Sequence, residues 1–140
     1  RQAAQARRDA SGSYAFTFAI QADLASWSKT AGLTAELGGA GAEALARLSG
    51  TSWDSKLFRG VTLKGGSYRL SAVAGGNLAG YLNHSGDWKS RAHVCQWSTE
   101  APAKIEKTIQ VEGGAYVLVA HVGGPKGTAS LKSLRLEPVP

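Results

Sequence analysis

The sequence contains only one cysteine, Cys95, among its 140 residues. An intrachain disulfide is therefore excluded, and the core must be stable through packing alone. Because Cys95 stands in an alternating apolar run, we interpret it as a small buried hydrophobic residue rather than a nucleophile. No apolar stretch approaches the roughly 18 residues that a membrane-spanning helix needs, so we expect no membrane span.

The residue patterns that enzymes use are also missing. The three histidines, His84, His93 and His121, do not have the spacing of metal ligands. No serine stands in a nucleophile elbow, and there is no phosphate-binding glycine loop. The ten acidic residues leave a carboxylate pair for glycoside hydrolysis as the one open catalytic option. We therefore expect a protein without catalysis, metal ion or cofactor.

Clustered positive charge is missing as well. The formal net charge is +6, from 16 lysines and arginines against 10 aspartates and glutamates. These charges are scattered through predicted loops and strand faces, whereas nucleic-acid binding usually needs a basic stripe. We expect no nucleic-acid partner, although the positive balance is compatible with an anionic polymer.

Glycine, in contrast, is abundant at 18 residues, and it separates short runs rich in β-branched and aromatic residues. Alternation of apolar and polar residues in these runs predicts many short strands with frequent turns. We interpret residues 1–12 as a flexible tail or linker and residues 13–140 as one domain. About ten strands without a long helix indicate an all-β, antiparallel sandwich or barrel. The predicted strands cover residues 13–20, 33–37, 42–48, 57–63, 67–74, 77–84, 91–97, 104–111, 115–122 and 129–137.

Two of these strands dominate the prediction. The runs 57–63 and 67–74 alternate on both sides of Gly65 and Gly66, a pair that accepts the positive φ of a tight turn. We therefore expect a half-buried antiparallel hairpin. Its second strand directs Tyr68 toward the core and leaves Arg69 on the wet face.

The same stretch resembles a known family. Residues 61–72, VTLKGGSYRLSA, resemble a motif of jelly-roll carbohydrate-binding modules with a galactose-binding-like β-sandwich. Residues 41–48, GAEALARL, look like a strand of such modules, and residues 127–138, GTASLKSLRLEP, are similar to their closing strand. The resemblance implies a two-sheet antiparallel jelly roll and non-catalytic carbohydrate binding. It also implies a secreted or cell-surface bacterial protein in which this domain is fused to others.

The chain departs from that family at one position. In many such modules an aspartate of the closing strand ligates a structural calcium ion, and here Lys132 stands in its place, beside Ser133. The acidic residue that the family often carries near its first strand has only Asp23 as a counterpart. Calcium takes roughly six to eight oxygen ligands, and an ammonium group repels it. We expect no structural calcium at Lys132.

The predicted hairpin of residues 77–84 and 91–97 is the candidate binding site. If Leu78, Leu82 and Val94 point into the core, alternation leaves two aromatic rings among polar groups on the outer face. Such a face suits a sugar, because pyranose C–H groups stack on aromatic rings while amide and guanidinium groups hold hydroxyls or carboxylates. The opposite interpretation, in which the rings fill the core, stays open. The predicted ligand-binding residues are Tyr81, Asn83, Arg91, His93 and Trp97, with Trp88 in the hairpin loop.

Four other side chains need an interpretation. Trp27 and Trp53 lie in predicted loops, and the resemblance to carbohydrate-binding modules implies that they fill the ends of the sandwich. Arg59 and Arg69 share a face of the predicted 57–74 hairpin, where they either favour an acidic glycan or only keep the sheet soluble. The predicted function is passive docking of a polysaccharide or oligosaccharide. The alternative is a structural or adhesive sandwich that mediates protein–protein assembly at a cell or particle surface.

Overall fold

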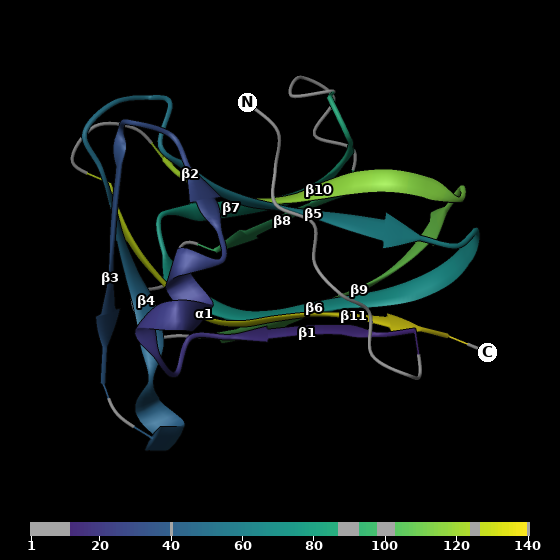
Figure 1. Ribbon diagram of the computed structural model, residues 1–140, viewed down its shortest axis with the longest axis horizontal. Helices are drawn as coiled ribbons and strands as arrows, with labels where there is room; N and C mark the ends of the chain where they lie inside the picture. The colour runs from purple at the N-terminus through teal and green to yellow at the C-terminus, as the bar shows by residue number, and fades with distance from the viewer. Residues whose placement is uncertain (1–11, 40, 87–92, 98–102, 124–126, 140) are drawn as a thin grey trace.

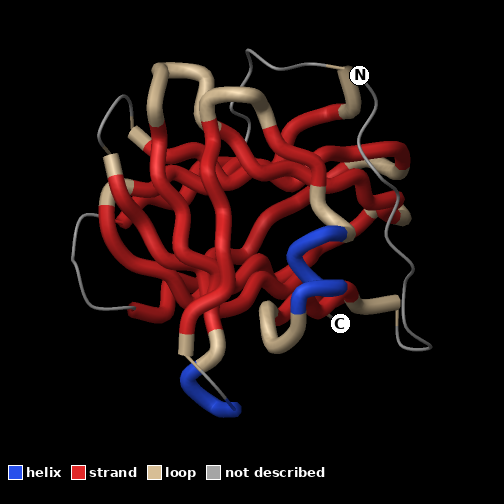
Figure 2. The backbone as a smooth tube through the Cα atoms, turned by 60° about the vertical axis from the view of Figure 1, so that its left-hand side comes forward, coloured by secondary structure: helices blue, strands red, loops and turns tan. Residues whose placement is uncertain are grey.

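The computed structural model describes residues 12–39, 41–86, 93–97, 103–123 and 127–139, with only the backbone given for Ala42 and for residues 93–97. In these residues two antiparallel sheets pack face to face (Figure 1). Among the described residues, helix is limited to two short segments (Figure 2). The predicted all-β, antiparallel two-sheet sandwich is therefore confirmed. The predicted tail, residues 1–12, lies almost wholly outside the described residues, so the division into tail and domain stays a prediction.

Six strands form one sheet and five form the other. The six-stranded sheet contains β1 (Tyr14–Thr17), β3 (Leu33–Gly38), β4 (Leu45–Gly50), β6 (Gly66–Gly76), β9 (Ala103–Val111) and β11 (Thr128–Pro138). The five-stranded sheet contains β2 (Ser28–Lys29), β5 (Lys56–Leu63), β7 (Leu78–His84), β8 (His93–Trp97) and β10 (Gly114–Val122). The orders are β3-β4-β11-β6-β9, with β1 also paired to β11, and β2-β5-β10-β7-β8.

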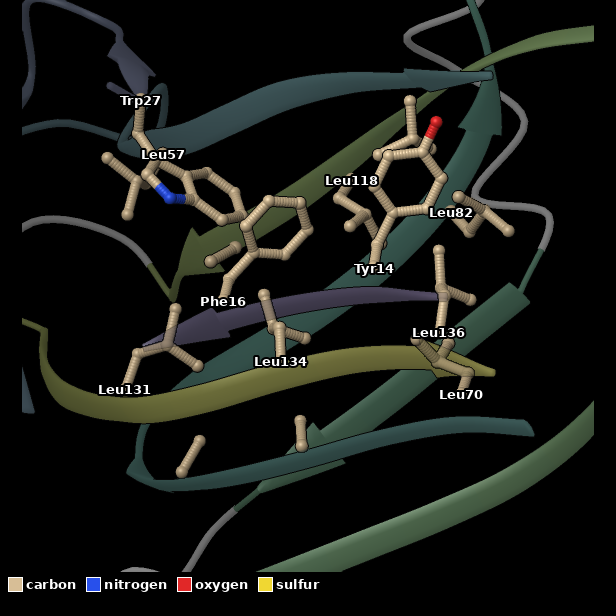
Figure 3. Close-up of a cluster of buried hydrophobic side chains, with 14 of the residues drawn as sticks. Tyr14, Phe16, Trp27, Leu57, Leu70, Leu82, Leu118, Leu131, Leu134 and Leu136 are labelled. Atoms are coloured by element: carbon tan, nitrogen blue, oxygen red, sulfur yellow. The ribbon is translucent and has the colours of Figure 1, made fainter. Parts of the chain in front are cut away.

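The main core lies between the sheets, where β11 contributes three leucines (Figure 3). Simple alternation predicts that Leu131 faces away from Leu134 and Leu136, but all three are buried in this core. The register of β11 against β6 shifts between Leu131 and Ser133, which inserts Lys132 as an extra residue. Such a bulge reverses the phase of the alternation, and this is why the prediction for Leu131 is wrong.

The predicted 57–74 hairpin is wrong in one respect. The two strands exist, but β5 belongs to the five-stranded sheet and β6 to the six-stranded sheet, so they do not pair. The turn between them is a corner that carries the chain from one layer to the other. It uses Gly66 at φ 143°, a conformation that favours glycine.

A second corner repeats the first. Between β9 and β10 the chain again changes sheet, and Gly114 has φ 155°. Two residues after each of these glycines, a tyrosine hydroxyl donates to a carbonyl four residues back: Tyr68 to Lys64 at 3.0 Å and Tyr116 to Glu112 at 2.8 Å. Burial, and secondly the charge of Glu112, raise the pKa of Tyr116. The hydroxyl therefore remains a donor at neutral pH.

Both corner hydroxyls should contribute similarly to stability. Replacing Tyr116 or Tyr68 by phenylalanine removes one hydrogen bond and keeps the buried ring, so we expect each change to lower the free energy of unfolding by about 0.5–1.5 kcal/mol. Urea denaturation of the two single variants and the double variant measures this. A change below the error of that measurement in both single variants would show that the corners do not depend on these hydroxyls.

The first predicted strand, 13–20, also ends earlier than expected. β1 stops at Thr17, and Asp23 Oδ2 accepts hydrogen bonds from Ala19 N at 2.9 Å and Ile20 N at 3.2 Å. This carboxylate stabilises the start of α1 (Gln21–Ala25), and Ile20 is 60% exposed instead of sharing the core with Phe16. In the same way, the predicted strand 42–48 begins as the 3₁₀ turn η1 (Gly41–Glu43) and continues as β4.

Candidate functional site

Successive side chains along each strand of the five-stranded sheet point to opposite faces of the sheet. Leu82 and Leu118 are paired neighbours that belong to the main core. Their sequence neighbours point the other way, and Val119 pairs with Tyr81 on one side and with Phe58 on the other. These side chains form a second buried cluster on what we call the outer face. The cluster consists of Phe58, Tyr81, Val117 and Val119, with Ala79 packed against it.

Two predicted binding residues lie on this outer face, as the alternation predicted, but neither is exposed. Tyr81 is 6% exposed and Asn83 is 1% exposed. The expectation that they form an open strip for a ligand is therefore wrong for the ring of Tyr81 in this structure. A buried ring cannot stack against a sugar without a rearrangement, so the aromatic surface for a ligand has to be sought elsewhere.

The predicted pairing of the 77–84 and 91–97 strands is confirmed as β7 and β8, but its register differs from the expected one. Tyr81 pairs with Val94, whereas Leu82 pairs with His93 and Leu78 with Trp97. Directly opposed residues of an antiparallel pair share a face. This backbone register differs by one residue from the register that the predicted grouping of Tyr81 with His93 and Trp97 requires.

The remaining hairpin predictions are not decided by the described residues. Trp88 and Arg91 lie outside them, and β8 is described by its backbone alone. The predicted ligand contacts of Trp88, Arg91, His93 and Trp97 therefore stay predictions. The same is true of the burial of Cys95, which pairs with Gly80.

The loop tryptophans have opposite environments. Trp27 is 6% exposed and packs edge-on against Phe16, with ring centroids 5.2 Å apart (Figure 3), so the expectation that it fills the sandwich is confirmed. Trp53 is 75% exposed, so the same expectation is wrong for it. Its neighbours Ser52, Asp54 and Ser55 are polar, and this was the sequence signal for an exposed ring.

The loop that carries Trp53 joins β4 to β5 and is fixed by hydrogen bonds on both sides. Ser55 is fully buried, and its hydroxyl lies 3.0 Å from the carbonyl oxygen of Gly32. Thr51 N donates to the same carbonyl at 2.8 Å. Thr30 Oγ1 donates to the Asp54 carbonyl and accepts from Lys56 N. The indole therefore projects from a backbone that is already ordered, which lowers the entropic cost of binding.

His121 connects this loop to the outer face. Its Nε2 lies 2.9 Å from the carbonyl oxygen of Trp53, and its Nδ1 lies 3.1 Å from the hydroxyl of Tyr81. A carbonyl only accepts, so Nε2 carries the proton and, in the neutral ring, Nδ1 accepts from Tyr81. Tyr81 thus holds the Trp53 loop in position through His121.

Two charged side chains follow Trp53 within three residues of the chain. Lys56 Nζ and Asp54 Oδ1 are 3.1 Å apart, and the side chain of Asp54 is largely exposed. The same short segment of the chain thus carries an exposed aromatic ring, one cationic group and one anionic group. This combination can stack on the C–H face of a sugar and hydrogen-bond its hydroxyls.

The two arginines do not share a face, contrary to the prediction. Arg69 of β6 is exposed and pairs with Glu106, with Nε 3.3 Å from Oε1. Arg59 of β5 lies opposite the core residue Leu118, so its side chain points between the sheets. They lie apart because β5 and β6 belong to different sheets.

The described residues contain no group of three His, Cys, Asp or Glu side chains that could hold a metal ion. Lys132 is the bulge residue of β11, and the carboxylate of Asp23 is bound to the backbone at the start of α1. These residues do not fit a calcium site. We expect the melting temperature to be the same in EDTA and in excess calcium, measured by differential scanning calorimetry. A large calcium-dependent rise would contradict this.

Comparison with known proteins shows what the chain resembles in fold. No protein-family model matches the sequence, and no curated protein matches it. Among solved structures, the CBM22-1 xylan-binding domain of Paenibacillus barcinonensis Xyn10C has a TM-score of 0.64 at 13% identity, covering 90% of this chain and 93% of that one. The carbohydrate-binding module CBM6cm-2 of Cellvibrio mixtus lichenase 5A, solved with cellotriose, has a TM-score of 0.60 at 11% identity, covering 91% and 98%.

Some similar structures contain the fold as one part of a longer chain. The Podospora anserina GH26-CBM35 β-(1,4)-mannanase has a TM-score of 0.60 at 13% identity, and the match covers 93% of this chain but 28% of that one. The chain therefore shares the β-sandwich fold of carbohydrate-binding modules. In the described residues, no helix is long and apolar enough to cross a membrane.

Proposed function

We propose that this protein binds carbohydrate without catalysis and docks a polysaccharide or oligosaccharide on the exposed indole of Trp53. The observation that carries the proposal is a 75% exposed indole on a loop fixed by hydrogen bonds. A tryptophan side chain offers a large apolar surface to a ligand, and tryptophan is enriched among the residues that dominate binding energy. The fold shared with structures named for xylan and cellotriose supports a saccharide as the ligand.

The proposed mechanism is passive recognition. One pyranose ring stacks on the indole of Trp53, while Asp54 accepts from and Lys56 donates to its hydroxyls. Few side chains take part and translational entropy is lost, so the affinity is on the order of micromolar to millimolar. Tyr81 acts as a positioning residue through His121.

We propose that the β7–β8 hairpin makes a second contact with a longer saccharide. The loop after His84 lies at the opposite end of the five-stranded sheet from Trp53, because His84 pairs with Tyr116 and His121 pairs with Lys56. A ligand that spans both ends would run along the strands. The residues proposed for this contact are Trp88, Arg91, His93 and Trp97, whereas Asn83 is too deeply buried to touch a ligand in this structure.

The wider setting is part of the same proposal. We propose a secreted or cell-surface bacterial protein in which this domain directs other domains to a polysaccharide. The support is that similar folds occur within longer chains, as in the mannanase of which the match covers 28%. The scattered positive charge, +6 in total, is compatible with neutral and anionic glycans alike.

The alternative function, protein–protein assembly, is disfavoured at one edge of the sandwich. β9 ends the six-stranded sheet and exposes Lys104, Glu106 and Lys107. Charged side chains on an edge strand oppose pairing with another chain. The β9 edge therefore disfavours pairing with a strand of another protein.

A glycan-array screen tests the proposed function. The wild-type protein is applied to immobilised xylan, β-glucan, mannan and uronic-acid glycans, beside Trp88→Ala and Trp97→Ala, and sedimentation velocity is measured over a hundredfold concentration range. We expect binding to at least one neutral glycan by a monomer, and weaker binding to long chains by the hairpin variants. No binding to any glycan together with concentration-dependent oligomers would replace this function by the assembly function.

A further inference from the structure

A pocket whose lining does not include Trp53 opens at one side of the sandwich. It has a volume of about 470 Å³, within the range of sites that hold small ligands. Its walls come from β1 of one sheet, Arg59 of the other sheet, and α1 with the turn after it, which contributes Ser26. Figure 1 shows α1 lying across the gap between the two layers on this side. Near the start of β1, Tyr14 Oη accepts a hydrogen bond from Thr62 N at 3.1 Å and donates one to the Thr62 carbonyl oxygen at 2.9 Å. These two bonds connect β1 to β5.

Arg59 is the unusual residue of this pocket. On the inner face of β5 its neighbours Leu57, Val61 and Leu63 are buried apolar core residues, so the alternation predicts another apolar side chain at position 59. Instead a guanidinium lies there, with its central carbon 5.1 Å from the ring centroid of Phe16. This cation–π contact holds the guanidinium over the ring of Phe16.

The positive charge of Arg59 lacks a carboxylate partner in the described part of the chain. One Nη donates to Ser26 Oγ, while Nε is buried without a hydrogen-bond partner among the described residues. Asp23 lines the same pocket, but its Oδ2 accepts from Ala19 N and Ile20 N, and among the described residues no ion pair joins it to Arg59. A partly buried cation with unused donors is destabilising until an anion reaches it.

We propose that this pocket binds a small ligand through a carboxylate group, which pairs with the guanidinium of Arg59 between the walls formed by β1 and α1. A planar carboxylate matches the fork of donors on a guanidinium. Burial lowers the pKa of Arg59, yet an arginine stays charged at neutral pH. The carboxylate can belong to a uronic acid or to a free organic acid. Trp53 does not line this pocket, so this inference is independent of the proposed function.

Calorimetric titration with D-glucuronate, acetate and D-glucose at constant ionic strength tests the proposal. We expect the wild-type protein to bind glucuronate and not glucose. Binding of glucuronate alone identifies a uronic acid as the ligand, and equal binding of acetate identifies any carboxylate. Arg59→Gln should weaken the binding of glucuronate at least about tenfold. Arg59→Lys, which keeps the charge and the packed stem, should weaken it less, because lysine lacks the fork.

Arg69→Gln is the matched control, since it removes the same charge from an exposed position that is paired with Glu106. It should bind glucuronate as the wild-type protein does. If Arg59→Gln fails to fold, Arg59→Lys decides. Failure of the wild-type protein to bind either carboxylate would overturn the proposal, as would undiminished binding by the folded Arg59 variants. Trp53→Ala should retain glucuronate binding, so a failure here is separable from a failure of the proposed function.

Discussion

Replacing Trp27 by alanine is expected to lower the free energy of unfolding by about 3–5 kcal/mol. The indole is buried and packs edge-on against Phe16. Its ring centroid lies 5.8 Å from the ring centroid of Phe18. Its removal leaves a cavity between the sheets beside α1, and the surrounding strands cannot close it because their registers are fixed by backbone pairing. Aromatic contacts with two neighbouring rings are lost at the same time.

Chemical denaturation followed by circular dichroism measures this effect. Trp27→Phe is the control, because it keeps an aromatic ring against Phe16, and it should cost clearly less than Trp27→Ala. A cost below about 1 kcal/mol for Trp27→Ala would mean that the indole is not part of the packed core.

Replacing Trp53 by alanine is expected to have the opposite effect: the stability should be kept, and saccharide binding should be weakened. The ring is 75% exposed, so the free energy of unfolding should change by no more than about 0.5 kcal/mol. Binding of the saccharide should weaken at least about tenfold, equivalent to about 1.4 kcal/mol. The reason is that truncating a tryptophan at the centre of a binding surface removes most of the apolar contact.

The matched control is Ile20→Ala. Ile20 and Trp53 are the exposed large hydrophobic residues of the described chain, and Ile20 stands before α1 in a different loop. Affinity electrophoresis in a gel containing the polysaccharide compares the three proteins. Equal retardation of Trp53→Ala and wild-type protein would remove Trp53 from the site, and equal losses in both variants would indicate non-specific apolar adsorption.

The fold could be predicted because its determinants are local. Period-two alternation located nearly all the strands, and the Gly-Gly pairs marked the turns. Local pattern cannot tell whether two strands joined by a tight turn pair with each other or with strands of opposite sheets, so β5 and β6 were predicted as a hairpin. It also cannot detect the bulge at Lys132, which puts Leu131 in the same core as Leu134 and Leu136.

The candidate site was harder to predict because it depends on register and on burial. The faces of β7 follow from Leu78 and Leu82, but the phase of β8 against β7 depends on the conformation of their loop. The polar neighbours of Trp53 in sequence indicate an exposed ring, but no sequence pattern shows that Trp27 is enclosed by Phe16 and Phe18. Arg59 stands between apolar strand positions, which is a sequence signal for an inward-facing arginine. It was instead predicted to lie on the sheet surface.

The indole N–H resonances of the four tryptophans give the most direct test of carbohydrate binding at Trp53. The Trp53 signal is the one that disappears from the ¹⁵N–¹H spectrum of Trp53→Ala, and the Trp27 signal is assigned in the same way from Trp27→Phe. On titration with xylohexaose or cellotriose, the Trp53 signal should shift with saturation at micromolar to millimolar ligand, while the signal of the buried Trp27 stays in place. A Trp53 signal that does not move when the saccharide binds, or no change in any signal with these ligands or those from the glycan screen, would contradict the account.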